Sequence, residues 1–442
     1  MAPRYAPSLW ARLPAMALML EIIFIVLFAF FVETEEFKKT KNQEFLYLYA
    51  NFQDVHVIVF LGFGFMSMFL VRYGFSGTGF GLLVAAMVVQ WATFINAFLS
   101  SFHSSHFKWP VQINLNRQGH ACVVMQRKDL FASDFQKIQH VVVTLVNAEL
   151  CAASALVAMG AVHGKTNPAQ LLLLGLLEVT GLVVNQGLIK KLFKNDTFNT
   201  TMQLHVFGAL FGVMTSWVLY RSEAEPRHEK EKFDSKTGLF STLGMLLLWM
   251  FWPSINFVQA QEIRIMYSTY LSLAVSAVTA MALSVLLSPK GKINLVHVQG
   301  AALAGGVAIG AIRTVLDPWV AMVIGMCATL LSTLGFRYMK DHMLFAFECH
   351  DTCGVLSVHA IPGILGWFAD LFLQLVNIDD ATIAIRFAVH YICILLISVS
   401  MSLVTGTITG FLLKLKFWKP QQDRKCFDDQ AFWEFPHLAV HN

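Results

Sequence analysis

Long apolar runs separated by short polar segments fill almost the whole chain. A helix that crosses a bilayer needs about 17–25 mostly apolar residues. The sequence offers such runs near 13–32, 53–72, 76–101, 139–162, 168–193, 198–220, 237–257, 264–288, 293–315, 318–337, 351–376 and 384–413. A transmembrane strand would instead show about ten residues of alternating polarity, and none of these runs does. The pattern predicts an all-α membrane protein with about 12 transmembrane helices.

The composition agrees with this prediction. The 442 residues are 56% hydrophobic and 14% charged, whereas a soluble domain carries roughly 25% charged residues. The net charge of +4 adds little, and we find no motif for a nucleotide, a nucleic acid or a nucleophilic reaction. Cys349, His350 and Cys353 lie close together, but no second group of ligands completes a metal site. We expect neither an enzyme nor a protein that depends on a metal or cofactor.

The charges between the runs predict the orientation of the chain in the membrane. Arg4 and Arg12 precede the first run, and the loop at 33–52 has no cationic excess. Positive residues are enriched in cytoplasmic loops. Several fall on the side that this topology makes cytoplasmic: Lys165, Lys290, Lys292, Arg337, Lys340, Lys414, Lys416, Lys419, Arg424 and Lys425. An even number of spans then places both termini in the cytoplasm.

Two similar segments indicate an internal repeat. Residues 205–212 read HVFGALFG and residues 359–366 read HAIPGILG. His205 follows Asp196 by nine residues, and His359 follows Asp351 by eight. Each histidine lies in the fifth span of a group of five, and an odd number of spans inverts the second group relative to the first. Transporters built this way place their site where the two halves meet.

The repeat divides the chain into predicted units. Residues 1–33 hold the N-terminal segment and the first span, and 53–220 and 237–376 are the two inverted five-helix repeats. Residues 221–236 (RSEAEPRHEKEKFDSK) form a solvated cytoplasmic linker between them. A last span at 384–413 and a cytoplasmic tail at 414–442 complete the chain.

The matched histidines have two interpretations. A single histidine inside a membrane commonly satisfies a backbone carbonyl at a helix contact. Ionisable residues in membrane spans nevertheless mark functional sites by default, and a symmetry-related pair strengthens that interpretation. Two neutral imidazoles can share one N–H···N hydrogen bond and keep other ring edges free for a small polar molecule that both donates and accepts.

Five motifs together resemble the Rh branch of the ammonium transporter and Rh glycoprotein family: QDVHVIVFLGFGF (53–65), LHVFGALFG (204–212), FWPSIN (251–256), VHVQGAALAGGVAIG (296–310) and DTCGVLSVHAIPG (351–363). The tail FDDQAFWEFPHLAVHN (427–442) is similar to that of the Rh blood-group D/CE polypeptides. The resemblance implies a plasma-membrane trimer, homo- or heteromeric, in which each subunit has a narrow pore. It implies a pore histidine pair at His205 and His359 and a vestibule aspartate near Asp196. Asp196 also fits a helix cap, so both roles stay open.

The sequence departs from the family pattern in two places. The family's two pore phenylalanines fall near Leu150 in NAELC and Ile255 in FWPSIN, with Phe251 close to the second position. Such a pore would be leakier, differently selective or closed by other side chains. Residues 103–138 are longer and more polar than the expected link. They are an extracellular loop of this lineage, a disordered insertion or retained non-coding sequence, and the foreign composition favours the last.

Two functions fit these observations. The first is a channel that conducts ammonia or ammonium, with carbon dioxide as a lesser alternative. The second is a structural subunit with little transport, which joins Rh-associated glycoprotein and ankyrin, the latter through the tail, in an erythroid membrane complex. The histidine pair favours conduction, whereas the missing phenylalanines and the tail favour the structural subunit. We expect Glu21 and Glu178, which lie inside spans, to hydrogen-bond at helix contacts, and AALAGGVAIGA (301–311) to allow close helix packing.

Overall fold

The computed structural model describes residues 12–33, 43–103, 113–114, 132–193, 200–220, 228–260, 262–314 and 316–434. In the first half, α1 (Leu13–Phe31) precedes a helix made of α2 (Gln43–Val57), the π-turn η1 (Ile58–Gly62), α3 (Phe63–Met66) and the 3-10 turn η2 (Ser67–Phe69). The remaining helices of this half are α4 (Gly74–His103), α5 (Ala132–Ala161), α6 (Pro168–Phe193) and α7 (Thr200–Leu219).

The second half has the same number of spans. It contains α8 (Ser235–Ala260), α9 (Ile263–Leu286), α10 (Leu295–Ala301) and α11 (Ala304–Gly310). There follow α12 (Pro318–Leu334) with η3 (Gly335–Met339) and α13 (Lys340–Phe347), then η4 (Leu356–Ala360) with α14 (Ile361–Val376), and the long α15 (Ala381–Lys414). Three short 3-10 turns end the chain: η5 (Lys416–Trp418), η6 (Asp423–Lys425) and η7 (Asp429–Ala431). Two-residue strands β1 (Val32–Glu33) and β2 (Ile113–Asn114) pair in parallel.

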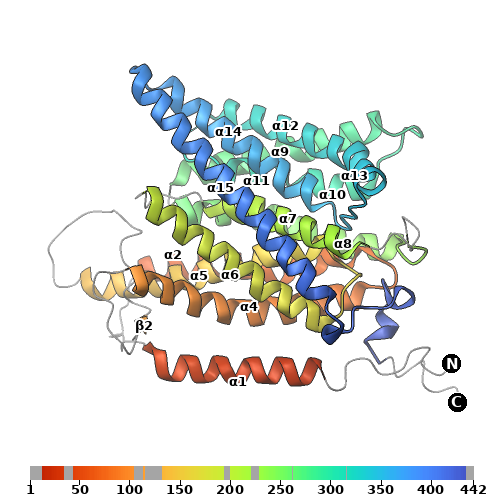
Figure 1. Cartoon of the computed structure of the whole chain (residues 1–442). Helices are drawn as coiled ribbons and strands as arrows, with labels where there is room; N and C mark the ends of the chain where they lie inside the picture. The colour runs from red at the N-terminus through yellow and green to blue at the C-terminus, as the bar shows by residue number, and fades with distance from the viewer. Residues whose placement is uncertain are drawn as a thin grey trace, which may run out of the picture.

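The predicted all-α membrane fold is confirmed. Within the described residues, ten helices are long and apolar enough to cross a membrane, and two shorter apolar helices cover Gln203–Leu219 and Leu295–Gly310. Each of these twelve segments coincides with a predicted span. The first residues of α1 and the last residues of α15 lie on the same side of the molecule (Figure 1). An even number of spans produces this arrangement.

The helices of the two halves make corresponding contacts. In the first half α4 packs on α5 and α6, and α5 packs on α6 and α7. In the second half α9 packs on α11 and α12, and α11 packs on α12 and α14. This is the pattern that two related five-helix units produce. The helix α15 crosses the molecule obliquely against α6 and α7, and α1 lies outside against α4 and α6 (Figure 1).

Small residues let the helices that carry the two histidines approach their neighbours closely. A Cβ added at Gly212 would lie 2.5 Å from the backbone oxygen of Ala158 in α5, and one at Gly366 would lie 2.1 Å from that of Ala308 in α11. These are the glycines that end the two matched sequence motifs. Because these glycines have no side chain, the two helices that carry the histidines can pack closely against their neighbours in the core.

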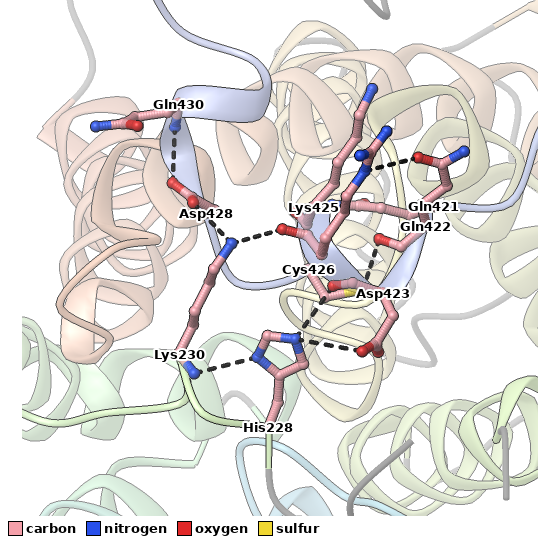
Figure 2. A network of polar contacts seen from close by, with 10 residues as sticks. His228, Lys230, Gln421, Gln422, Asp423, Lys425, Cys426, Asp428 and Gln430 are labelled. Carbon is pink, nitrogen blue, oxygen red and sulfur yellow. Dashed lines mark hydrogen bonds and ion pairs between the residues drawn. The ribbon is translucent and has the colours of Figure 1, made fainter. Parts of the chain in front are cut away.

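In the described part of the predicted linker, Glu229 and residues 232–236 are exposed, whereas His228, Lys230 and Glu231 are partly buried. Lys230 Nζ lies 3.0 Å from a carboxylate oxygen of Asp428 and also donates to the carbonyl of Arg424, and His228 Nε2 lies 3.1 Å from the carbonyl oxygen of Asp423 (Figure 2). The mixed charge of this segment is used to hold the tail. Of the anomalous segment 103–138, the structure describes the last residue of α4, strand β2 and the start of α5, and the remainder lies outside the described residues.

Candidate functional site

His205 and His359 meet in the core between the two halves. His205 comes from α7 and His359 from η4, and their side chains are almost fully buried. Their Nδ1 atoms lie 3.2 Å apart, with ring centroids separated by 5.0 Å and planes inclined by 18°. One Nδ1 must therefore donate a proton to the other. His205 Nε2 is buried and has no hydrogen-bond partner among the described residues.

The backbone around His359 explains how that ring is presented. Pro362 has no N–H to donate to the carbonyl four residues before it, and the preceding turn is a π-turn in which Ile361 N donates to Leu356 O. Such turns occur often at functional sites. Asp351 caps the start of this segment, because its two carboxylate oxygens accept from Val355 N and Leu356 N at 3.0 Å each. Gly354 has a φ of +71°, which favours glycine.

A tryptophan lies beside the ring of His205. The ring of Trp252 in α8 stacks on His205 with a centroid distance of 5.6 Å and an angle of 19°. A Cβ at Gly306 would come within 2.8 Å of Trp252 Nε1, so the glycine of α11 leaves the room that the indole fills. Trp252, His205 and His359 thus lie in a row of nearly parallel rings supplied by α8, α7 and η4, which come from both halves.

The predicted gate positions fall in the same apolar core. Leu150 and Ile255 are each 4% exposed and belong to one cluster with Trp252. Phe251 is half-buried and packs against that cluster from outside, so Trp252 is the aromatic residue that faces the pair. Asp196 lies outside the described residues.

Two carboxylates beside the gate positions escaped the sequence prediction. Glu149, the neighbour of Leu150, is buried and lies 2.5 Å from His56 Nδ1, and its second oxygen has no partner among the described residues. Asp54 accepts a hydrogen bond of 2.6 Å from Ser254, the neighbour of Ile255. The helix α2 therefore brings Asp54 and His56 to both gate helices. An acidic residue inside an apolar span, as in NAELC, is the signal that could have indicated Glu149 in advance.

A cavity of about 100 Å³ adjoins His359. Its walls are largely apolar and include Phe60, Phe63 and Val358, with Gln299 adding an amide. The cavity extends to Ser67, His163, Thr352 and Cys353, which lie at the ends of helices and in the loops that follow them. It therefore connects the buried histidine with the side of the molecule where α1 begins and α15 ends.

Charged groups hold the loop that leads to His359. Lys165 Nζ donates to Ser216 Oγ at 2.8 Å and to the carbonyl of His350, and Lys340 Nζ donates to the carbonyl of Thr352 at 2.7 Å. His350 Nε2 lies 3.3 Å from Glu231. Burial lowers the pKa of Lys165 to about 8. Burial also lowers the pKa of His350, and the charge of Lys165 lowers it further against the opposing effect of Glu231.

The side chains of Cys349 and His350 make contacts with neighbouring segments. His350 pairs with Glu231, and Cys349 Sγ lies 3.6 Å from the carbonyl oxygen of Val213. Burial raises the pKa of both Cys349 and Cys353 to about 12, which keeps the thiols protonated.

The chain is similar to known proteins over nearly its full length. The Ammonium Transporter Family profile matches residues 15–432. The chain is 36% identical over 442 residues to Ammonium transporter Rh type A of Bos taurus, covering 96% of this chain and 95% of that protein. It is 35% identical over 463 residues to Ammonium transporter Rh type B of Danio rerio, with coverage of 97% and 94%.

The fold is also similar to solved structures. Rh50 of Nitrosomonas europaea superposes with a TM-score of 0.74 at 26% identity, covering 90% of this chain and 96% of that one. A Sensor Amt Protein at 15% identity gives a TM-score of 0.63 over 90% of this chain and 98% of that chain, which shows the shared fold. The chain therefore belongs to the Ammonium Transporter Family, in its Rh branch, a family of membrane transporters and channels rather than enzymes.

Proposed function

We propose that this protein is a plasma-membrane channel that recruits ammonium at its outer mouth and conducts neutral ammonia past His205 and His359. Family membership supports transport of ammonium. The observation that carries the proposal is the buried imidazole pair, with Nδ1 atoms 3.2 Å apart and a cavity beside His359.

The chemistry of the pair suits ammonia. A charged side chain at the centre of a membrane costs about 2.5–3.5 kcal/mol even on the most favourable scales. An ammonium ion that loses its hydration there meets a penalty of the same kind. Ammonia carries no charge and both donates and accepts hydrogen bonds. His205 Nε2 is a buried polar atom without a partner among the described residues, and such an atom costs about 1–3 kcal/mol until a guest satisfies it. A path lined by these rings therefore favours the neutral molecule over the ion.

Two carboxylates support recruitment of ammonium at the proposed outer mouth. Glu149 is the neighbour of Leu150 in the sequence. Asp54 accepts a hydrogen bond from Ser254, the neighbour of Ile255. Carboxylates stabilise a nearby cation, whereas the aliphatic side chains at the gate positions have no charge or hydrogen-bonding group that could do so. We propose that ammonium gives up its proton to the water of the outer mouth before ammonia enters the path, and that Leu150, Ile255 and Trp252 exclude water beyond that point. We retain Asp196 as a second recruiting carboxylate.

We also propose the assembly and orientation that the sequence predicted. The subunit would form a trimer, with itself or with other Rh-family subunits, with both termini in the cytoplasm. The start of α1 and the end of α15 lie on the same side of the molecule, which supports placing both termini on one side of the membrane (Figure 1). The cavity beside His359 would then open toward the cytoplasm.

One observation favours a structural subunit as the second candidate function. Leu150 and Ile255 are aliphatic where the resemblance implies aromatic side chains. In that case the protein would hold a membrane complex together, with Rh-associated glycoprotein and ankyrin as partners, and would conduct little ammonia or carbon dioxide.

Reconstitution separates the two candidates. Purified protein in liposomes that contain a pH-sensitive dye is exposed to an ammonium gradient, and the rate of internal alkalinisation is followed by stopped flow. Conduction predicts faster alkalinisation than in protein-free liposomes of the same lipid. A rate equal to that of protein-free liposomes, with the protein shown to be inserted and folded, contradicts the channel and supports the structural role. The same vesicles in a carbon dioxide gradient test the lesser alternative.

A further inference from the structure

A second buried acid lies one helix away from the histidine pair. Glu178 of α6 is fully buried, and its Oε1 lies 2.5 Å from Ser154 Oγ of α5. The same hydroxyl oxygen lies 3.0 Å from the carbonyl oxygen of Leu204, the residue before His205 in α7. Glu178, Ser154 and Leu204 therefore form a chain of polar contacts that ends on the backbone of the helix carrying His205.

The hydrogen atoms in this chain determine the state of Glu178. A serine hydroxyl has one proton, and a backbone carbonyl can only accept. When Ser154 donates to Leu204 O, the contact of 2.5 Å with Glu178 is a hydrogen bond only if the carboxyl group supplies the proton. The other oxygen of Glu178 has no partner, and no cationic side chain among the described residues contacts it. A bare buried carboxylate is strongly unfavourable inside a membrane.

Helix packing does not by itself require these polar groups. In the second half, alanines occupy the positions that match Ser154 and Glu178, namely Ala304 and Ala328, and both are fully buried. The match follows from the close glycine contacts, because Gly212 faces Ala158 as Gly366 faces Ala308, and Gly175 faces α4 as Gly325 faces α9. The first half thus carries a polar chain where the two matching positions of the second half hold alanines.

We propose that Glu178 is a neutral carboxylic acid in the folded protein and that, acting through Ser154, it is a positioning residue that fixes α7 and the ring of His205 against His359. Its effect on transport rests on the proposed function, whereas its protonation can be tested without transport. The sequence prediction that Glu178 hydrogen-bonds at a helix contact is met by Ser154.

Infrared spectroscopy of the purified full chain tests the protonation. The wild type should show a carbonyl-stretch band of a protonated carboxyl group that is lost in Glu178→Gln. The matched control, Asp317→Asn, changes an exposed acid at the start of α12 and should leave the band in place. Spectra of wild type and Glu178→Gln that do not differ in this region would overturn the proposal.

Ammonia flux in liposomes tests the positioning. Glutamine can still donate to Ser154 Oγ, so Glu178→Gln should conduct within about twofold of the wild type. Ser154→Ala and Glu178→Leu break the chain and should each lower the flux about fivefold, the effect of one ordinary hydrogen bond. Loss in Glu178→Gln equal to that in Glu178→Leu would show that a charged carboxylate is needed and would refute the proposal. A wild type without flux would refute the proposed function while the infrared result still decides the protonation.

Discussion

Removing the carboxylate of Asp351 should loosen the segment that carries His359. Asp351 accepts from Val355 N and Leu356 N at 3.0 Å each and is itself buried. Replacing a capping carboxylate by alanine costs about 0.5–2 kcal/mol, and a hydrogen bond to a charged group contributes about 1.5–3 kcal/mol. When both bonds are lost and the segment relaxes in part, the free energy of local opening should fall by about 2–4 kcal/mol.

That free energy has a measurable consequence. Since each 1.4 kcal/mol is about tenfold in an equilibrium constant, the amides of Val355 and Leu356 should exchange with solvent about 30- to 700-fold faster in Asp351→Ala. Hydrogen exchange followed by mass spectrometry of peptides that cover 350–360 measures this change. Ammonia flux should fall in the same variant, because His359 loses its fixed position.

The chain provides a matched control. Asp380 caps α15 in the same way, accepting from Thr382 N at 2.7 Å and Ile383 N at 3.0 Å, but it is exposed at the helix start. Asp380→Ala should speed exchange at the start of α15 and leave both the 350–360 peptides and the flux unchanged. Unchanged exchange at Val355 and Leu356 in Asp351→Ala, or an equal loss of flux in Asp380→Ala, would refute the reasoning.

Four further variants test the packing and the charged loop. Trp252→Leu leaves space beside His205 and should lower the free energy of unfolding by about 2–4 kcal/mol, measured by thermal denaturation in detergent. Gly366→Ala places a Cβ 2.1 Å from a backbone oxygen and should cost about 3 kcal/mol or more. Gly74→Ala, with 3.8 Å of clearance, should change stability little, and equal losses in both would contradict the close contact. Burial in the folded protein lowers the pKa of His350. The unfolded chain therefore binds more protons below about pH 6.5, and the free energy of unfolding should fall on acidification from pH 7.5 to 5.5. His350→Asn should reduce that fall, and an identical pH dependence would rule out this residue as its source.

The sequence predicted the spans and the histidine pair because both depend on local signals. Apolar runs of bilayer length indicate helices directly, and the motifs at His205 and His359 share a histidine and a closing glycine. The glycine contacts explain that spacing, since Gly212 and Gly366 each meet a backbone oxygen on the neighbouring helix.

Contacts between distant segments could not be predicted in the same way. Trp252 stacks on His205 only because Gly306 leaves room in a third helix. Glu149 meets His56 across 93 residues of sequence, and no spacing rule relates them. The tail contacts of Lys230 likewise depend on where two charged segments emerge from the bundle, and a mixed-charge sequence alone does not indicate them (Figure 2).

Ammonia flux in liposomes that hold His205→Leu, His359→Leu or the double variant tests the central proposal most directly. The control is His390→Leu, a histidine of α15 that packs on Phe193 rather than on the pair. Each pore histidine offers about one hydrogen bond to the passing molecule, so each single variant should lose roughly fivefold of the flux, the double variant more, and His390→Leu none. Flux through the double variant equal to that of the wild type would contradict a conduction path lined by the two rings.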